Sequence, residues 1–348
     1  MHGMKKRRRT PSWASVFQRS LSAMTRMTKA ASSRSVPKTP ASRRVAQALK
    51  PLAPRRVPAS TAGSWLPGVV MGAAGARRYG LYRPPGVKLG ERLPLMVMLH
   101  GCGQDAAGFA AVTRMNRIAM KQRFLVLYPE QDRLANVNAC WNWYDIGNGR
   151  AYGEAALIMK MVDHVCLLYP ADRARVAVAG LSAGASMAAL LVTRYPGRFR
   201  AVVMHSGIPP GTAHSGLSAL GAMRGRRATV PLAATPEAMQ AHWPPLLVIH
   251  GDADHVVAPA NGRAAAQAWA QAAGAREGAA REVQRGQRYA AAVTDFKQQG
   301  RTVATLVAVD GLAHAWSGGA ASQPFSDALG PDASRMAWAF AARQFRLA

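Results

Sequence analysis

The chain has 348 residues, 49% of them hydrophobic and 18% charged, so it can bury the core of one large or two ordinary domains. It contains 45 Lys and Arg against 17 Asp and Glu, a formal net charge of +28, and 15 of the basic residues lie within residues 1–60. The absence of an 18-residue apolar run excludes a membrane-spanning helix, and three cysteines are too few for a disulfide-rich scaffold.

The beginning of the chain differs in composition from the rest. Residues 1–75 are rich in Arg, Lys, Ser and Pro, and the first acidic residue is Glu91. Such a segment cannot offset the entropy of ordering, so we predict a basic, disordered extension ahead of a folded domain over residues 76–348. It lacks the apolar stretch of a secretory signal. Contact of residues 1–60 with nucleic acid or an anionic surface is the functional alternative to a solvated tail.

From about residue 76, short apolar segments alternate with segments of helical composition. We expect strands at 76–84, 93–101, 124–130, 175–182, 201–207, 245–251 and 302–311, and helices at 106–121, 153–168 and 183–195. This alternation indicates the α/β class, with a mostly parallel central sheet and helices on both faces. Residues 208–244 fall outside it and are expected to form a lid over the carboxyl edge of the sheet, while 271–290 are expected to be exposed.

The segment Gly180-Leu181-Ser182-Ala183-Gly184 lies where an expected strand becomes a helix. Glycines two residues before and after a serine allow a sharp turn, which exposes the hydroxyl and points the first N–H groups of the helix at the same spot. Ser182 is therefore the predicted nucleophile.

A serine nucleophile needs a base, and the base needs a carboxylate that orients it. Asp254 lies in the loop after the strand at 245–251, and His314 lies in the loop after the last strand. We predict Asp254 as the orienting acid and His314 as the base, in the chain order Ser, Asp, His. Asp252 is the first alternative to Asp254, and Asp310 is the second.

The oxyanion formed in acyl transfer needs N–H donors. The backbone N–H of Ala183 is one predicted donor because this residue follows the nucleophile. The N–H of Cys102, in the glycine-rich loop after the strand at 93–101, is the other. The alternative for this loop is an ordinary strand-to-helix turn.

The segment HGDADH also allows a metal-dependent hydrolase, with His250, Asp252, Asp254 and His255 as ligands. That alternative needs further histidines and leaves the serine turn unexplained, so we expect no metal and no organic cofactor. His205 and His250 end strands and are expected to bind backbone groups instead.

Short motifs occur in a fixed order along residues 75–348: LHGCGQ, YPEQ, CWNWY, YPADRARVAVAGLSAGASM, HSG, HGDADHVVAPAN, GLAHAWSGG and GPDASR. Together they resemble the polyhydroxybutyrate (PHB) depolymerase family of esterases, a branch of the α/β-hydrolase superfamily. The resemblance implies an α/β-hydrolase fold, a triad of Ser182, Asp254 and His314, and Cys102 and Ala183 as oxyanion donors. It also implies hydrolysis of short-chain hydroxyalkanoate esters by a secreted enzyme. Relatives include feruloyl and acetylxylan esterases, so polysaccharide acyl esters are an alternative substrate class.

Some features depart from the family pattern. Gly103 stands where the family commonly carries Thr, and Ala185 replaces a frequent glycine, which would tighten the pocket. No polymer-binding module follows the last expected helix, so we expect soluble oligomers or small esters as substrates rather than insoluble granules. Because no signal peptide is recognisable, a cytoplasmic location is the alternative to the extracellular one that the resemblance implies.

The cysteines and tryptophans near these motifs leave alternatives open. Cys102 and Cys140 each follow a strand expected to end at the upper edge of the sheet, and they form either a disulfide or a pair of buried thiols. Trp141, Trp143 and Trp316 either line an apolar acyl pocket or pack in the core.

A binding protein is the alternative from another functional class, with an idle hydrolase fold and a basic tail that contacts polyanions or anionic surfaces. The intact triad argues against it, so the prediction is ester hydrolysis through an acyl-enzyme. Removal of residues 1–60 separates the two, because it would abolish polyanion binding and leave esterase turnover intact.

Overall fold

The computed structural model describes residues 63–228 and 243–347. Residues 1–62 of the predicted extension and residues 229–242 of the predicted lid lie outside this part of the chain. Within the described residues, no helix has the length and apolar character that crossing a membrane requires.

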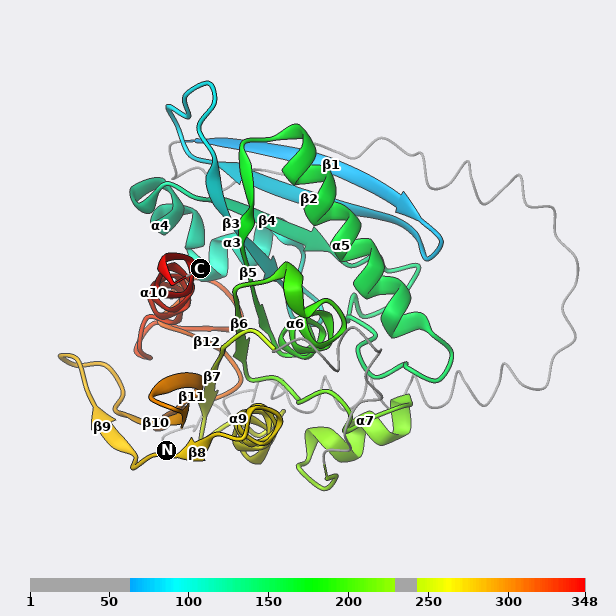
Figure 1. Ribbon diagram of the computed structural model, residues 1–348. Helices are drawn as coiled ribbons and strands as arrows, with labels where there is room; N and C mark the ends of the chain where they lie inside the picture. The colour runs from blue at the N-terminus through cyan, green and yellow to red at the C-terminus, as the bar shows by residue number, and fades with distance from the viewer. Residues whose placement is uncertain (1–62, 229–242, 348) are drawn as a thin grey trace, which may run out of the picture. The chain divides into compact units, whose positions relative to one another are not determined.

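The central feature is a mixed sheet whose middle strands run parallel (Figure 1). In spatial order these strands are β4 (Leu125–Glu130), β3 (Leu93–Leu99), β5 (Ala171–Leu181), β6 (Ala201–His205), β7 (Leu246–Gly251) and β11 (Arg301–Val309). The inner ones are apolar and buried over most of their length, as expected for strands covered on both faces. Because they are parallel, their carboxyl ends meet at one edge of the sheet.

Antiparallel strands extend the sheet on both sides. The added strands are β1 (Ser64–Gly72) and β2 (Gly75–Arg83) beside β4, and β10 (Ala291–Gln298), β8 (Arg276–Glu277) and β9 (Arg281–Val283) beside β11. Strand β1 lies within the segment that composition assigned to the extension, so the folded region begins before residue 76. This edge strand is largely exposed and contains Pro and Gly, and its sequence therefore lacks the apolar run of a buried strand.

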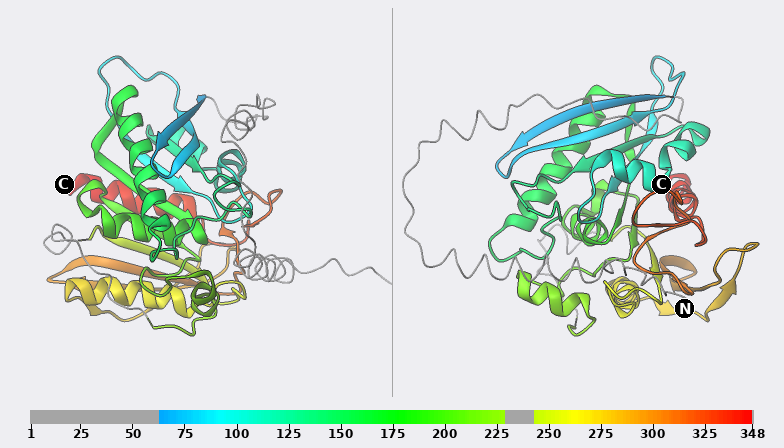
Figure 2. Two further views of the ribbon diagram at one scale, coloured as in Figure 1. Left: turned by 90° about the vertical axis from the view of Figure 1, so that its right-hand side faces the viewer. Right: turned by 180° about the vertical axis from the view of Figure 1, so that it is seen from behind.

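Helices cover both faces of the sheet, as Figures 1 and 2 show. One face carries α5 (Arg150–Leu168), α6 (Ala183–Arg194) and α9 (Ala260–Ala273), and the other carries α3 (Ala106–Thr113), α4 (Met115–Gln122) and α10 (Ala333–Arg346). Each set packs against its own hydrophobic core. This arrangement confirms the predicted fold class. The remaining described elements are η1 (Pro196–Arg198), α7 (Gly216–Met223), β12 (Trp316–Ser317) and β13 (Ser326–Asp327).

The helix expected at 106–121 is divided in two. Arg114, between α3 and α4, has a φ of 53° and turns the chain in the left-handed region. Its guanidinium donates to the carbonyl of Gly318, in the segment that follows His314. This contact joins residues far apart in the sequence, and the local pattern over 106–121 did not indicate the break.

Candidate active site

Ser182 occupies a strained turn between β5 and α6. Its φ is 56° and its ψ is −121°, a conformation that side-chain-bearing residues rarely adopt. A Cβ on Gly180 would lie 2.3 Å from the carbonyl carbon of Gly184, and a Cβ on Gly184 would lie 2.2 Å from the Leu99 carbonyl oxygen. The two glycines therefore let the helix start directly against strands β5 and β3, while Ser182 as a residue stays 8% exposed.

Asp254 and His314 come together from the loops after β7 and β11. The Nδ1 atom of His314 lies 2.8 Å from Oδ2 of Asp254, whose side chain is buried. Oδ1 of Asp254 accepts hydrogen bonds from the N–H groups of Val256 and Val257 at 2.9 and 2.8 Å. Because the carboxylate only accepts, Nδ1 of His314 is the donor, and Nε2 of the neutral ring is left to accept a proton.

The electrostatics of this pair favour an ionised acid. Burial by itself would raise the pKa of the Asp254 carboxyl, but hydrogen bonds from His250 and His314 lower it well below its usual range. Nε2 of His250 lies 3.4 Å from Oδ2 of Asp254 and 2.9 Å from the Val257 carbonyl oxygen. Asp254 thus stays a carboxylate over the whole neutral pH range, as an orienting acid must.

The alternative acids take other places. Oδ1 of Asp252 accepts the Gly311 N–H at 2.6 Å, so this side chain holds the turn that precedes His314. Asp310 is exposed at the end of β11, and its N–H donates to the Ala290 carbonyl. Among the described residues, Asp254 is the only one of these three carboxylates that forms a hydrogen bond with the His314 imidazole.

Within the described part of the chain, Oγ of Ser182 and the His314 ring do not form a hydrogen bond. Catalytic hydrogen bonds are often long before substrate binds, so this geometry is compatible with the predicted triad.

The loop after β3 lies against the serine turn. A Cβ on Gly101 would lie 3.6 Å from Cβ of Ser182. The N–H of Gly101 donates to Oε1 of Gln104 at 2.9 Å, and that of Gly103 donates to the Asn138 carbonyl at 2.8 Å. Between them, the N–H of Cys102 has no hydrogen-bond partner in the described part of the chain, and neither has that of Ala183 at the first position of α6. Both predicted oxyanion donors are therefore free to bind a ligand.

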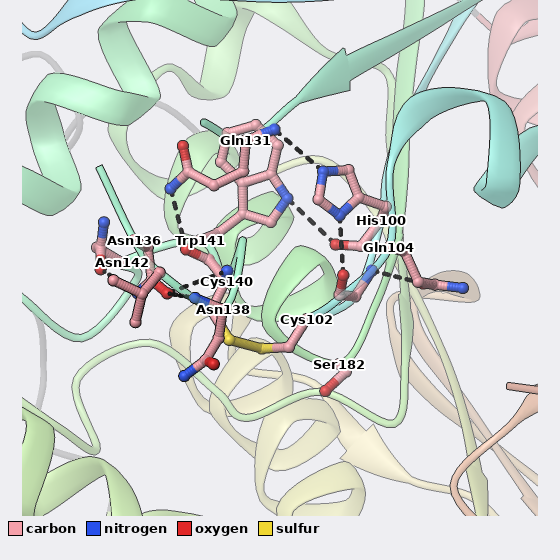
Figure 3. The surroundings of a disulfide bond; sticks show 12 residues. His100, Cys102, Gln104, Gln131, Asn136, Asn138, Cys140, Trp141, Asn142 and Ser182 are labelled. Carbon is pink, nitrogen blue, oxygen red and sulfur yellow. Dashed lines mark hydrogen bonds between the residues drawn. A yellow bond between two sulfur atoms is a disulfide. The ribbon is translucent and has the colours of Figure 1, made fainter. Parts of the chain in front are cut away.

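Cys102 is joined to Cys140 by a disulfide, with an S–S distance of 2.07 Å and a Cα–Cα distance of 4.2 Å. Figure 3 shows this bond beside Ser182, with the indole N–H of Trp141 directed at the His100 carbonyl, 3.1 Å away. The disulfide and the indole attach the loop after β3 to the loop after β4. The third cysteine, Cys166, is a buried free thiol in α5, and burial raises its pKa.

The tryptophans separate into two groups. Trp141 is 1% exposed and Trp316 is 0% exposed, and the indole N–H of Trp316 donates to Oγ of Ser334. Side chains buried to this degree offer a substrate no surface, so of the two alternatives that the sequence left open, packing in the core describes Trp141 and Trp316. Trp143 is also mostly buried, with its ring edge-on to that of Tyr144.

The remaining histidines at the sheet edge bind main-chain groups. Nε2 of His205 accepts the N–H of Ser317, three residues after His314 in the sequence, at 3.0 Å. Burial lowers the pKa of His205 to about 3, and that of His100 to about 4. Among the described residues, no three His, Cys, Asp or Glu side chains gather as metal ligands.

The sequence analysis missed a buried polar network behind the Cys140 loop. Its centre is Glu154 on α5, which is 1% exposed and accepts hydrogen bonds from Gln131 and Asn142. Asn142 lies within the motif CWNWY, but a glutamate within a helix gave no signal of its own.

Comparison with known proteins places the chain in a family. Residues 77–286 match the sequence model described as Esterase PHB depolymerase, a region that includes Ser182 and Asp254. The poly(3-hydroxyalkanoate) depolymerase C of Paucimonas lemoignei is 36% identical over 175 residues, which are 48% of this chain and 42% of that protein. Feruloyl esterase B of Neurospora crassa is 28% identical over 201 residues, 54% of this chain and 68% of that protein. The chain thus spans less than half the length of the first of these relatives.

A solved structure supports the fold. The acetyl xylan esterase from Aspergillus awamori superposes with a TM-score of 0.56 at 20% identity and covers 72% of this chain and 94% of that one. At this identity the likeness shows the fold alone, and it agrees with the α/β-hydrolase prediction. The match to the family model extends over more than half of the sequence, and the chain belongs to the Esterase PHB depolymerase family.

Proposed function

We propose that this chain is a serine esterase that hydrolyses short-chain hydroxyalkanoate oligomers of the PHB type or other small acyl esters. The observation that carries the proposal is the hydrogen bond between His314 and the buried Asp254, at the same sheet edge as the strained turn of Ser182. The relative from Paucimonas lemoignei, named a poly(3-hydroxyalkanoate) depolymerase, supports this substrate class.

The reaction proceeds by acyl transfer in two steps. Nε2 of His314 takes the hydroxyl proton as Oγ of Ser182 attacks the ester carbonyl, and the resulting oxyanion accepts hydrogen bonds from the N–H groups of Cys102 and Ala183. The bond to the alcohol breaks, and the alcohol leaves with the proton from His314. Water then attacks the acyl-enzyme with His314 again as base, which releases the acid and restores Ser182.

The acyl pocket is proposed to lie between the loop after β4 and the start of the predicted lid. Ile208, the first residue of that segment, donates its N–H to Oγ of Ser186 on α6 at 2.8 Å. Further along, a Cβ on Gly216 would lie 4.0 Å from the ring of Tyr144, which neighbours Trp143. Trp143 is therefore the tryptophan we propose at the pocket, while residues 229–242 of the lid lie outside the described part.

The substrate test compares wild type with Ser182→Ala on p-nitrophenyl esters of graded acyl length and on a 3-hydroxybutyrate trimer. We expect hydrolysis by wild type that is fastest for short acyl chains or the trimer, and loss of at least about 10³-fold in the variant. Equal rates in the two proteins would contradict the proposal.

A carbohydrate esterase is the second candidate, favoured by the match to the Neurospora crassa feruloyl esterase over 68% of that protein. Methyl ferulate and acetylated xylo-oligosaccharides, assayed beside the trimer, separate the two candidates by their kcat/KM values. The polyanion-binding alternative depends on residues 1–60, which lie outside the described residues, and it stays a prediction.

An extracellular location is also part of the proposal. The disulfide between Cys102 and Cys140 supports it, because disulfides persist mainly in oxidising compartments. The free thiol content of the protein isolated from its native compartment tests it. One thiol per unfolded chain, from Cys166, is the expected result, and three would contradict it.

A further inference from the structure

Behind the disulfide lies a buried carboxylate that no step of the reaction uses. Oε1 of Glu154 accepts hydrogen bonds from Nδ2 of Asn142 at 2.6 Å and from Nε2 of Gln131 at 2.7 Å, and Oε2 accepts the Asn142 backbone N–H at 2.8 Å. The guanidinium of Arg77, itself buried, lies 3.6 Å from Oε1. A charged group taken out of water in this way is stable only when its hydrogen-bonding capacity is met, as it is here.

The partners of Glu154 also form hydrogen bonds with residues 136–140 of the loop after β4, which we call the Cys140 segment. Nε2 of Gln131 also donates to the Cys140 carbonyl at 2.9 Å. Oδ1 of Asn142 accepts from Nδ2 of Asn136 at 2.8 Å, and Oδ1 of Asn136 accepts the backbone N–H of Asn138 at 3.0 Å and of Cys140 at 3.3 Å. Figure 3 shows these amide side chains gathered around the disulfide.

The Cys140 segment in turn holds the loop that carries the proposed oxyanion donor. The disulfide fixes Cys102, and the Asn138 carbonyl accepts the Gly103 N–H at 2.8 Å. Gln131 adds a second route, because its backbone N–H donates to Nε2 of His100 at 3.0 Å, while Nδ1 of His100 lies 2.8 Å from the Gly101 carbonyl oxygen. Burial keeps the His100 ring neutral by lowering its pKa to about 4, which lets Nε2 accept and Nδ1 donate.

We infer that Glu154 is a positioning residue for the oxyanion hole: it aims the Cys102 N–H through Gln131, Asn142 and the disulfide-bearing loop. This inference rests on the proposed esterase function and names the residues that hold the proposed oxyanion donor in place. A donor displaced by a fraction of an ångström loses much of its hydrogen bond to the oxyanion, which exists only in the transition state. Loss of Glu154 should therefore lower kcat with little effect on KM.

Glu154→Gln is the test variant, because it keeps the size of the side chain and places an NH₂ group against N–H donors. On p-nitrophenyl butyrate we expect kcat to fall at least tenfold and KM to stay within threefold. Glu154→Asp should recover part of the loss. Asp163→Asn, on the same helix and paired with Arg173 at the surface, is the matched control and should stay within twofold of wild type.

A second readout reports the oxyanion hole alone. The probe 1,1,1-trifluoro-2-pentanone adds to Ser182 and forms an oxyanion, whereas 1,1,1-trifluoro-2-pentanol forms none. In Glu154→Gln the inhibition constant of the ketone should rise at least tenfold and that of the alcohol should stay within twofold. A general loss of structure would weaken the binding of the ketone and of the alcohol to the same degree, and that result would overturn the inference. A kcat equal to that of wild type would overturn it as well.

If Glu154→Gln does not fold, Asn136→Ala decides by the same criteria, since it cuts the link from Asn142 to Asn138 and Cys140 and leaves the partners of Glu154 in place. A threefold or larger loss of kcat, with the same difference between ketone and alcohol, is expected, and wild-type values overturn the inference. A wild-type protein that hydrolyses no ester and does not bind the ketone overturns the proposed function and this inference together. An active wild type with an unaffected Glu154→Gln overturns the inference alone.

Discussion

Glycine is needed on both sides of Ser182 because a side chain there would collide with the neighbouring backbone, and the stability cost of such a side chain can be measured. Gly180→Ala would place a Cβ 2.3 Å from the backbone of Gly184, so β5 and α6 must separate. We expect a loss of about 2–3 kcal/mol in the free energy of unfolding, measured in urea. Gly197→Ala, where no atom lies within 4 Å, is the control and should stay within about 0.5 kcal/mol. Equal stability of the two variants would contradict the packing described for the turn.

The hydrogen bond from His314 to Asp254 sets which imidazole nitrogen carries the proton. Asp254→Asn keeps the shape of the side chain but removes the charge that orients Nδ1–H, so kcat should fall about 10³-fold or more with KM nearly unchanged. Steady-state kinetics on p-nitrophenyl butyrate provide the measurement. Asp252→Asn, which alters only the Gly311 turn, should cost less than about tenfold. A larger loss in Asp252→Asn than in Asp254→Asn would reverse the assignment of the acid.

Single site residues could be predicted from the sequence where a residue of the right chemical type directly follows a strand. Asp254 and His314 each follow a parallel strand, and parallel strands end at one edge of the sheet, so their hydrogen bond could be predicted. Ser182 follows a third strand of the same sheet, and its place in a triad stays a prediction. The role of Trp141 and Trp316 could not, because a buried tryptophan and a pocket tryptophan have the same sequence signature.

Among the elements, the loops after β3 and β4 act as one unit because the Cys102–Cys140 disulfide joins them across 38 residues. Closing a loop of that length restricts the unfolded chain by about 4 kcal/mol in the chain-entropy treatment. Cys140→Ser should therefore lower the unfolding free energy by about that amount. The matched control is Cys166→Ala, which removes a buried thiol that bridges nothing and should cost about 1 kcal/mol. If the two variants lost similar amounts of unfolding free energy, the disulfide would add no stability beyond that of a buried cysteine side chain.

The strands and helices that could be predicted are those with strong local patterns. The inner strands are continuous apolar runs, and α6 follows the serine turn directly. The break at Arg114 and the edge strand β1 were missed. Arg114 contacts Gly318, which is distant in sequence, whereas β1 pairs with the next strand along the chain and lacks an apolar run of its own.

Across the whole molecule, two cores on opposite faces of one sheet bury neutral histidines at the site edge. His100 and His205 have folded pKa values of about 4 and about 3, below the ordinary value of 6.5. As pH falls below 6.5, the unfolded chain takes up protons before the folded one does, so these histidines stabilise the fold fully above pH 6.5 and lose that contribution towards pH 4 and pH 3. The loss is on the order of 3 kcal/mol for each histidine by pH 4.

Urea unfolding between pH 7 and pH 4 measures this dependence. The free energy of unfolding should decrease steadily over that range, and the lowered pKa of Asp254 adds to the decrease at the acid end. His255→Gln, a change at an exposed histidine, should leave the slope unchanged. A constant free energy from pH 7 to pH 4.5 would contradict the burial of neutral histidines.

The α/β class of the described residues was predictable from the alternation of strands and helices, but the network around Glu154 was not. Glu154 on α5 binds Gln131 and Asn142 of the preceding loop and lies beside Arg77 of the more distant β2, and these pairings follow only from the packed structure. Buried polar networks of this kind satisfy one another in space, and the sequence contains no spacing rule for them.

The most direct test of the account is covalent trapping of the nucleophile. The protein is treated with a fluorophosphonate, its intact mass is measured, and the modified peptide is sequenced. We predict one adduct per chain, on Ser182, formed at least about 10²-fold more slowly in His314→Ala and absent in Ser182→Ala. An adduct on another serine, or none in a folded wild type that hydrolyses esters, would contradict the assignment of Ser182 as the nucleophile.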